Sequence, residues 1–130
     1  FLKIPSVAMS LAREEHMDFE KAAKYCAEIL KKLMPLRSGD VINVNIPWLS
    51  KGEPKGIKVV PQSTEGFHEY YISQKNEQGQ TVFQLAGGNH RDEKRLSDNT
   101  ALAEGFITIT ALIADMTNHE KTGRLEQIKW

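Results

Sequence analysis

The 130 residues of the chain are enough for one modest domain, and its shares of hydrophobic (40%) and charged (26%) residues are ordinary for a globular protein. Seventeen basic residues balance seventeen acidic ones, so the charge gives no reason to expect a nucleic acid or an anionic membrane as a partner. The apolar stretches are too short to span a bilayer.

The first two predicted elements are a short strand and a long helix. Residues 4–9 form an apolar run that is typical of a strand covered on both faces in a parallel sheet. Residues 18–34 carry apolar side chains at helical spacing, Asp18 is a good N-cap, and Pro35 ends the helix. The single cysteine, Cys26, lies on the apolar face of this helix. We therefore expect it to be a small core residue in a reducing, cytoplasmic compartment.

The middle of the chain is predicted to contain two strands and a β-hairpin. Residues 41–46 alternate between apolar and polar side chains, which indicates a half-buried strand, and residues 57–60 form another short strand. The hairpin spans about residues 67–85, with a polar loop between its strands. Because both of its faces are apolar, we expect it to pack against its own domain or against another subunit. Residues 87–95 are predicted to form a loop.

The last third of the chain is predicted to contain a helix, a strand and a final helix. The short helix ends at Ala103 and can be capped by Ser97 or Asp98. Residues 106–113 are rich in β-branched side chains and indicate a strand. No internal repeat or linker divides the chain, so we treat residues 1–130 as part of one domain.

Sequence motifs of known chemistry are scarce. The chain has no P-loop, no dinucleotide-binding glycine motif, no zincin motif and no nucleophile elbow. The most suggestive pair is Asp115 and His119, which stand where a strand ends and a helix begins. Ligands of α/β sheets usually bind beyond strand ends, and an aspartate there could orient the imidazole by accepting a ring N–H.

The same residues also have a purely structural interpretation, which the local sequence favours. Thr117 and Glu120 fit a capping box that would open a final helix over about residues 118–128. Asp115 would then help to cap this helix, and His119 would lie on its surface.

Several segments, in this order along the chain, resemble the SurE (survival protein E) family of nucleotidases. The resemblance covers nearly all 130 residues, and the NVNIP and D-x-T-x-H patterns at their proper separation carry most of it. The matching segments are Ile4-Pro5-Ser6-Val7-Ala8-Met9-Ser10, Ile42-Asn43-Val44-Asn45-Ile46-Pro47, Lys55-Gly56-Ile57-Lys58-Val59, Ser97 to Thr110, and Asp115-Met116-Thr117-Asn118-His119. In two departures, Ser97 replaces a usual threonine and Ala111 replaces a proline.

The resemblance implies an α/β fold, namely a three-layer α/β/α sandwich of Rossmann-like type with the hairpin as a protruding arm. It implies a 5'/3'-nucleotidase that hydrolyses nucleoside monophosphates with Mg²⁺ or Mn²⁺. Family members are much longer, and their N-terminal half carries the metal ligands. The resemblance therefore implies that this chain is the C-terminal half, that it contains no metal ligand, and that it is inactive alone.

The resemblance also implies partners and site residues. We expect a homodimer or homotetramer that assembles through the hairpin arm and the C-terminal segment. Asp115 and His119 are the expected supporting catalytic groups. Ser6, Ser10 and Asp98 are the expected substrate-binding groups.

Two other interpretations remain open. The first is a non-catalytic oligomerisation or binding module built on the same half-fold. The residues that precede Phe1 would distinguish it, because a strand ending in two consecutive aspartates supports the enzyme. The second is a self-contained hydrolase that uses Asp115 and His119. It is the least favoured, since no nucleophile or third orienting group accompanies the pair.

Overall fold

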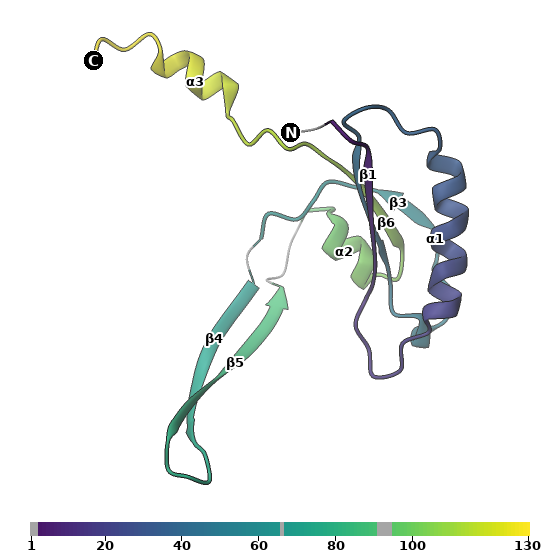
Figure 1. The fold of residues 1–130 in the computed structure, drawn as a ribbon, viewed down its shortest axis with the longest axis vertical. Coiled ribbons are helices and arrows are strands. Elements are labelled where there is room, and N and C mark those ends of the chain that lie inside the picture. Colours follow the sequence, from purple (N-terminus) through teal and green to yellow (C-terminus); the bar gives the residue numbers. More distant parts are fainter. Residues whose placement is uncertain (1–2, 66, 91–94) are drawn as a thin grey trace.

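A computed structural model describes residues 3–65, 67–90 and 95–130 of the chain. Figure 1 shows a body that contains the main sheet, an arm that projects from this body, and a C-terminal tail that leads away from it. Within these described ranges, no helix is both long and apolar enough to cross a bilayer.

The body is built on a four-stranded mixed sheet with the order β1-β2-β6-β3. Its strands are β1 (Ser6–Leu11), β2 (Val41–Ile46), β3 (Ile57–Val59) and β6 (Ile107–Leu112). The strand β1 runs parallel to β2, β6 runs antiparallel to β2, and β3 runs parallel to β6. The sheet therefore ends at β1, which has a strand partner on one side only among the described residues.

The helix α1 (Phe19–Leu33) covers one face of the sheet. The Asp18 carboxylate caps it as predicted, by accepting from the amide of Lys21 at 2.9 Å. The core beneath the helix consists of Ala22, Ile29, Val44, Ile46, Leu49 and Ile107. Each large apolar side chain buried here stabilises the fold by roughly 1.5–3 kcal/mol.

Cys26 packs at the margin of this core, which confirms the packing role predicted for it. Burial raises the pKa of its thiol. Because the thiolate is the reactive form of cysteine, this shift disfavours a nucleophilic role.

The opposite face of the sheet is polar. Alternate positions of β2 and β6 place Asn43, Asn45, Thr108 and Thr110 on it. A short helix, α2 (Asp98–Ala103), packs against β6 where both threonines are buried. The helices α1 and α2 thus lie on opposite faces of the sheet, which confirms the expected α/β fold with three layers.

The first strand differs from the expectation that both of its faces are covered. Its residues alternate between half-buried positions (Val7, Met9, Leu11) and exposed ones (Ser6, Ala8, Ser10). The half-buried side chains pack against the core below α1. No described segment covers the exposed side chains, so the polar face is open over β1.

The arm is a two-stranded hairpin of β4 (Phe67–Lys75) and β5 (Thr81–His90). Asn76 shapes its turn, because its side-chain oxygen accepts from the amides of Gln78 and Gln80 at 3.1 and 2.9 Å. The strand β5 continues to His90, so the loop predicted from residue 87 is wrong over its first part. A bulge between His68 and Glu69 adjusts the pairing there, and a bulged strand tolerates glycine.

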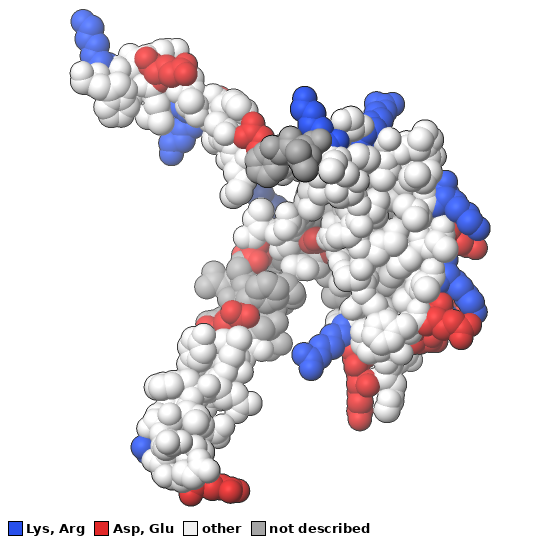
Figure 2. Space-filling model, in the orientation of Figure 1, with Lys and Arg blue, Asp and Glu red and all other residues white. Residues whose placement is uncertain are grey.

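The arm exposes large apolar side chains on both of its faces. They are Tyr70, Tyr71, Ile72, Val82, Phe83 and Leu85, and they are between 38% and 70% exposed. Figure 2 shows that the arm is largely uncharged between its base and its tip. The structure therefore shows a hairpin that is not buried against its own domain.

The C-terminal tail carries the last helix, α3 (His119–Leu125). Its N-cap is Asn118, whose side-chain oxygen accepts from the amide of Lys121 at 2.8 Å. The capping box predicted at Thr117 is therefore wrong by one residue, and the helix ends earlier than the predicted residue 128. None of the residues of α3 is buried, and Figure 1 shows the tail leading away from the body.

Candidate functional site

On the polar face of the sheet, three side chains from neighbouring strands form a row of hydrogen bonds. Ser10 Oγ donates to Asn45 Oδ1 at 2.7 Å, and Asn45 Nδ2 donates to Thr108 Oγ1 at 3.3 Å. The register places these residues side by side on β1, β2 and β6. Thr108 is fully buried, so Asn45 supplies the partner that its hydroxyl needs. The row ends at Ser10, which is exposed and accessible to a ligand.

Ser6 lies at the other end of β1. Its hydroxyl donates to the carbonyl of Ile4 at 3.2 Å, within the same segment. It stands four positions before Ser10 in the strand, which corresponds to about 13 Å. Ser6 and Ser10 share a face but are too far apart to bind one small group together.

Asp98 is the first residue of α2 and is only 7% exposed. Its Oδ1 accepts from the amide of Ser63 at 2.8 Å and from the amide of Asn99 at 2.8 Å. In addition, its own amide donates to the carbonyl of Pro61 at 2.9 Å. Asp98 therefore joins the segment after β3 to the start of α2, and its contacts are those of a structural residue.

Asp115 and His119 do contact each other, as their spacing predicted. His119 Nε2 lies 2.7 Å from Asp115 Oδ2, and the other oxygen, Oδ1, accepts from the amide of Thr117 at 2.8 Å. The two side chains are well exposed, at 55% for Asp115 and 76% for His119. The carboxylate can thus fix one ring nitrogen of the imidazole and leave the other free to hold a proton.

The environment of Asp115 favours its charged form. The hydroxyl and the amide of Thr117, followed by His119, hold the pKa of this carboxyl below its ordinary value. A carboxylate that stays ionised remains an acceptor for the imidazole N–H throughout the neutral range.

The structure brings together only one pair of the five predicted site residues, Asp115 and His119. In the described part of the chain, Ser6, Ser10 and Asp98 form no hydrogen bond with one another, and none of them bonds to this pair. Sequence reasoning missed Asn45, which links Ser10 to Thr108. The polar positions of the strand over residues 41–46 pointed to it, but the strand register that aligns it with Ser10 is not visible in the sequence.

The described residues do not fit a divalent metal ion. No group of three or more histidine, cysteine, aspartate or glutamate side chains comes together in the part of the chain that the structure describes. Mg²⁺ and Mn²⁺ prefer several oxygen ligands, and the carboxylates of Asp98 and Asp115 already have amide partners.

Comparison with known proteins gives consistent matches. A family model described as "Survival protein SurE" matches residues 1–69. The 5'-nucleotidase SurE of Pseudoalteromonas atlantica is 34% identical over 130 residues, which cover 98% of this chain and 52% of that protein. The 5'-nucleotidase SurE of Aquifex aeolicus is 34% identical over 124 residues, which cover 92% and 49%.

A solved structure supports the same relationship. The crystal structure of SurE protein from Aquifex aeolicus matches this fold with a TM-score of 0.72 and 31% sequence identity. The match covers 96% of this chain and 53% of that chain. The chain thus spans about half the length of the relatives that it matches.

Proposed function

The chain belongs to the SurE family, and on this premise we propose that it is the C-terminal part of a 5'/3'-nucleotidase. Such an enzyme is a phosphomonoesterase that releases phosphate from nucleoside monophosphates. One observation carries the proposal: the 34% identity to a protein named 5'-nucleotidase SurE extends over 98% of this chain. Because the chain spans half of that relative, the activity is proposed for the intact protein, and these 130 residues alone are expected to be inactive.

We propose that the metal ligands for Mg²⁺ or Mn²⁺ lie outside these 130 residues. The described side chains do not fit such an ion. In addition, β1 ends the sheet with an unpaired edge and an open polar face in the described part of the chain. A strand edge of this kind readily accepts a further strand. The proposed metal-binding segment would complete the sheet at this edge.

Three residues are proposed to serve the substrate, with unequal support. Ser10 has the strongest support, since it is exposed near the carboxyl end of β1, where ligands of α/β sheets usually bind. Ser6 lies at the far end of the strand. Asp98 would act indirectly, by holding the segment at Ser63 in place.

Asp115 and His119 are proposed to support catalysis by handling a proton. Hydrolysis of a phosphomonoester produces an alkoxide that needs a proton, and imidazole is suited to this transfer near neutral pH. In the proposed arrangement, Asp115 orients the ring through its Oδ2. Because the pair lies on the tail (Figure 1), exchange of the C-terminal segment between subunits would bring it to a partner's active site.

We further propose a cytoplasmic homodimer or homotetramer that assembles through the arm and the C-terminal segment. The exposed Tyr71 and Phe83, at 70% and 69%, support an interface on the arm. Exposed apolar patches of this kind usually mark protein–protein contacts. On the tail, the exposed Leu125 and Ile128 supply a second apolar surface.

The experiment that tests the function is a phosphatase assay on the intact protein. Release of phosphate from 5'-AMP and 3'-AMP, with Mn²⁺ or Mg²⁺ added, is compared with release from a sugar phosphate that lacks a base. The proposal expects faster turnover of the nucleotides. Equal turnover of all three substrates would point to a general phosphatase.

A second candidate is a non-catalytic assembly module, and the exposed apolar arm favours it specifically. This module would associate into oligomers but would release no phosphate from any nucleotide. The same assay, combined with a measurement of the oligomeric state, therefore separates the two candidates.

A further inference from the structure

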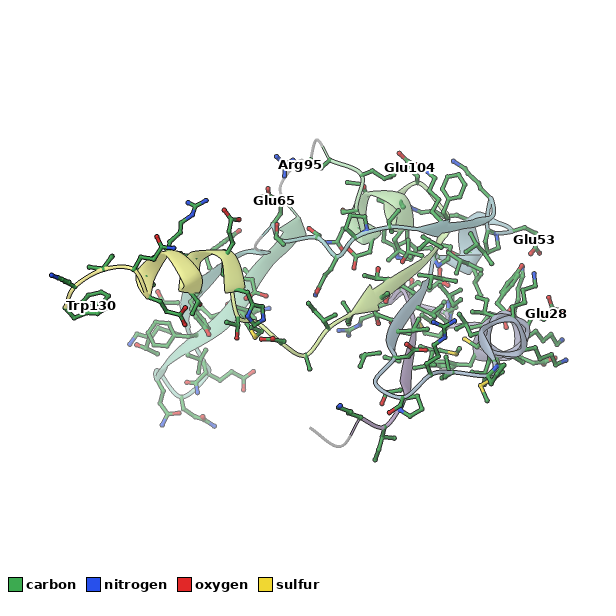
Figure 3. All side chains as sticks on the ribbon, turned by 90° about the horizontal axis from the view of Figure 1, so that it is seen from above. Glu28, Glu53, Glu65, Arg95, Glu104 and Trp130 are labelled. Atoms are coloured by element: carbon green, nitrogen blue, oxygen red, sulfur yellow. The ribbon has the colours of Figure 1, made fainter. Side chains whose placement is uncertain are left out.

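A pocket of about 280 Å³ lies at the carboxyl end of β2, and its lining includes none of the five candidate site residues. One wall is the turn over residues 47–55, which includes a short 3-10 helix, η1 (Leu49–Lys51). The other wall is the end of α2 and the turn at Gly105. Glu53 and Glu104 both line the pocket, and Figure 3 shows Glu53 at the end of the body opposite to the tail that ends at Trp130, with Glu104 at the upper edge of the body.

The two walls of this pocket are fixed by backbone hydrogen bonds. The amide of Lys55 donates to the carbonyl of Gly105 at 2.9 Å, and the amide of Ile107 donates to the carbonyl of Gly56 at 2.9 Å. The indole of Trp48 is held as well, because its Nε1 donates to the carbonyl of Arg13 at 3.2 Å. The pocket is therefore largely formed before any ligand arrives, which lowers the cost of binding.

Both carboxylates of the pocket are already neutralised by cations outside its lining. Glu53 pairs with Lys21 at 2.6 Å and also accepts from the Tyr25 hydroxyl. Glu104 pairs with Lys58 at 2.7 Å. These contacts hold the pKa of each carboxyl below its ordinary value.

Of the two lysines that line the pocket, Lys51 has no such partner, whereas Lys55 lies close enough to Glu104 to contribute, after Lys58, to the lowered pKa of that carboxyl. Neither Lys51 nor Lys55 forms an ion pair with any described carboxylate. The Lys51 ammonium is held 4.0 Å from the centre of the Trp48 ring, and that of Lys55 lies 6.0 Å from the centre of the Phe106 ring. The lining and its ion-pair partners contain four lysines and two glutamates, so the group carries a net charge of +2.

One feature of the pocket opposes an anion. The carboxyl end of a helix carries a partial negative charge, and α2 ends at this wall. However, two carbonyls near this end accept backbone amides: that of Thr100 from Glu104 at 3.1 Å, and that of Leu102 from Gly105 at 2.9 Å. The two full positive charges of Lys51 and Lys55 outweigh the partial charge of about half a unit that a helix end carries.

We propose that this pocket binds the phosphate group of a small anion, through Lys51 and Lys55. Two ammonium groups beside an indole suit a dianionic phosphate, either free or as part of a nucleotide. No metal ion and no group of the proposed catalytic pair takes part. The proposal therefore stands independently of the nucleotidase activity.

The test is a calorimetric titration of the intact protein with inorganic phosphate and, separately, with AMP, both in EDTA. The chelator prevents hydrolysis and removes any phosphate bound at a catalytic metal. We expect saturable binding that the K51Q/K55Q variant weakens by about tenfold or more, since each charge-assisted contact contributes substantially. Tighter binding of AMP than of phosphate would identify the nucleotide as the ligand, and equal binding would identify the phosphate group alone.

Two control variants keep the test decisive. K31Q/K32Q removes the same charge from the exposed surface of α1 and should leave the affinity unchanged. K51R/K55R keeps both charges and should retain binding, even if the glutamine variant is unstable. The proposal is overturned if phosphate shows no saturable binding in EDTA. It is equally overturned if K31Q/K32Q weakens binding as much as K51Q/K55Q.

Discussion

Asn45 forms hydrogen bonds with Ser10 on one side and with Thr108 on the other, and the bond to Ser10, at 2.7 Å, is the shorter of the two. Replacing Asn45 with alanine leaves the buried Thr108 hydroxyl without its partner. We expect N45A to lower the free energy of unfolding by about 1–3 kcal/mol, the usual cost of an unsatisfied buried polar group. S10A, which changes an exposed residue, should cost no more than about 0.5 kcal/mol. Urea unfolding checks both, and equal losses would contradict the role assigned to Asn45.

Asp98 gives a second stability prediction, because its Oδ1 accepts both backbone amides, those of Ser63 and Asn99. D98A removes both hydrogen bonds and should lower the free energy of unfolding by about 1.5–3 kcal/mol. D98N keeps an accepting oxygen and should lower the free energy of unfolding clearly less than D98A does. Thermal unfolding and the KM for a nucleoside monophosphate are measured together. A large rise in KM at unchanged stability would show that Asp98 binds the substrate directly.

The lowered pKa of the Asp115 carboxyl predicts that the stability of the tail depends on pH. Its pKa is lowered by Thr117 first and by His119 second. A carboxyl whose folded pKa lies below its unfolded value, which is about 3.9, stabilises the fold above that value. This contribution is lost as the pH falls through the lowered pKa. A ¹³C NMR titration of the carboxyl should show its midpoint moving up in T117A and, to a smaller extent, in H119A. Unchanged midpoints would refute the assigned cause.

Substitution of His119 distinguishes a catalytic role of this residue from a structural one. Its side chain is 76% exposed and belongs to a helix with no buried residue. H119A should therefore leave the Tm of the intact protein nearly unchanged while it lowers kcat for a nucleoside monophosphate. K121A, on the same helix, serves as the control and should keep its kcat. A lower Tm with unaltered kcat would support the surface-helix interpretation instead.

If the arm forms the subunit interface, a polar substitution on it should change the oligomeric state. Phe83 is 69% exposed on β5, and Val59, on the short strand β3, is 77% exposed. F83S should shift the intact protein toward smaller oligomers in analytical ultracentrifugation, because it removes apolar area from the proposed interface. V59S removes a comparably exposed side chain from the body and should not. Dissociation by both variants, or by neither, would contradict an interface on the arm.

Local patterns predicted the elements whose partners are close in the sequence or whose periodicity is strong. The strand over Val41–Ile46 was predicted with its observed bounds, because its alternating apolar residues face the core below α1. The extension of β5 to His90 was missed. It depends on pairing with Phe67 and on a bulge, which no local signal announces.

The candidate site shows the same division between local and long-range information. The contact of Asp115 with His119 joins residues four positions apart, and the spacing predicted it. The separation of Ser6 from Ser10 follows from the strand between them. By contrast, the partnership of Ser10 with Asn45 spans 35 positions and depends on the β1–β2 register. The open face of β1 was missed because an apolar run does not reveal which segment will cover it.

Phosphate release from a nucleoside monophosphate by the intact protein is the decisive measurement for the proposed nucleotidase activity. We expect release in Mn²⁺ or Mg²⁺, loss of release in EDTA, and recovery when the metal is restored. Release that is unaffected by EDTA would contradict the proposed metal dependence. The absence of any release with either metal would contradict the function itself.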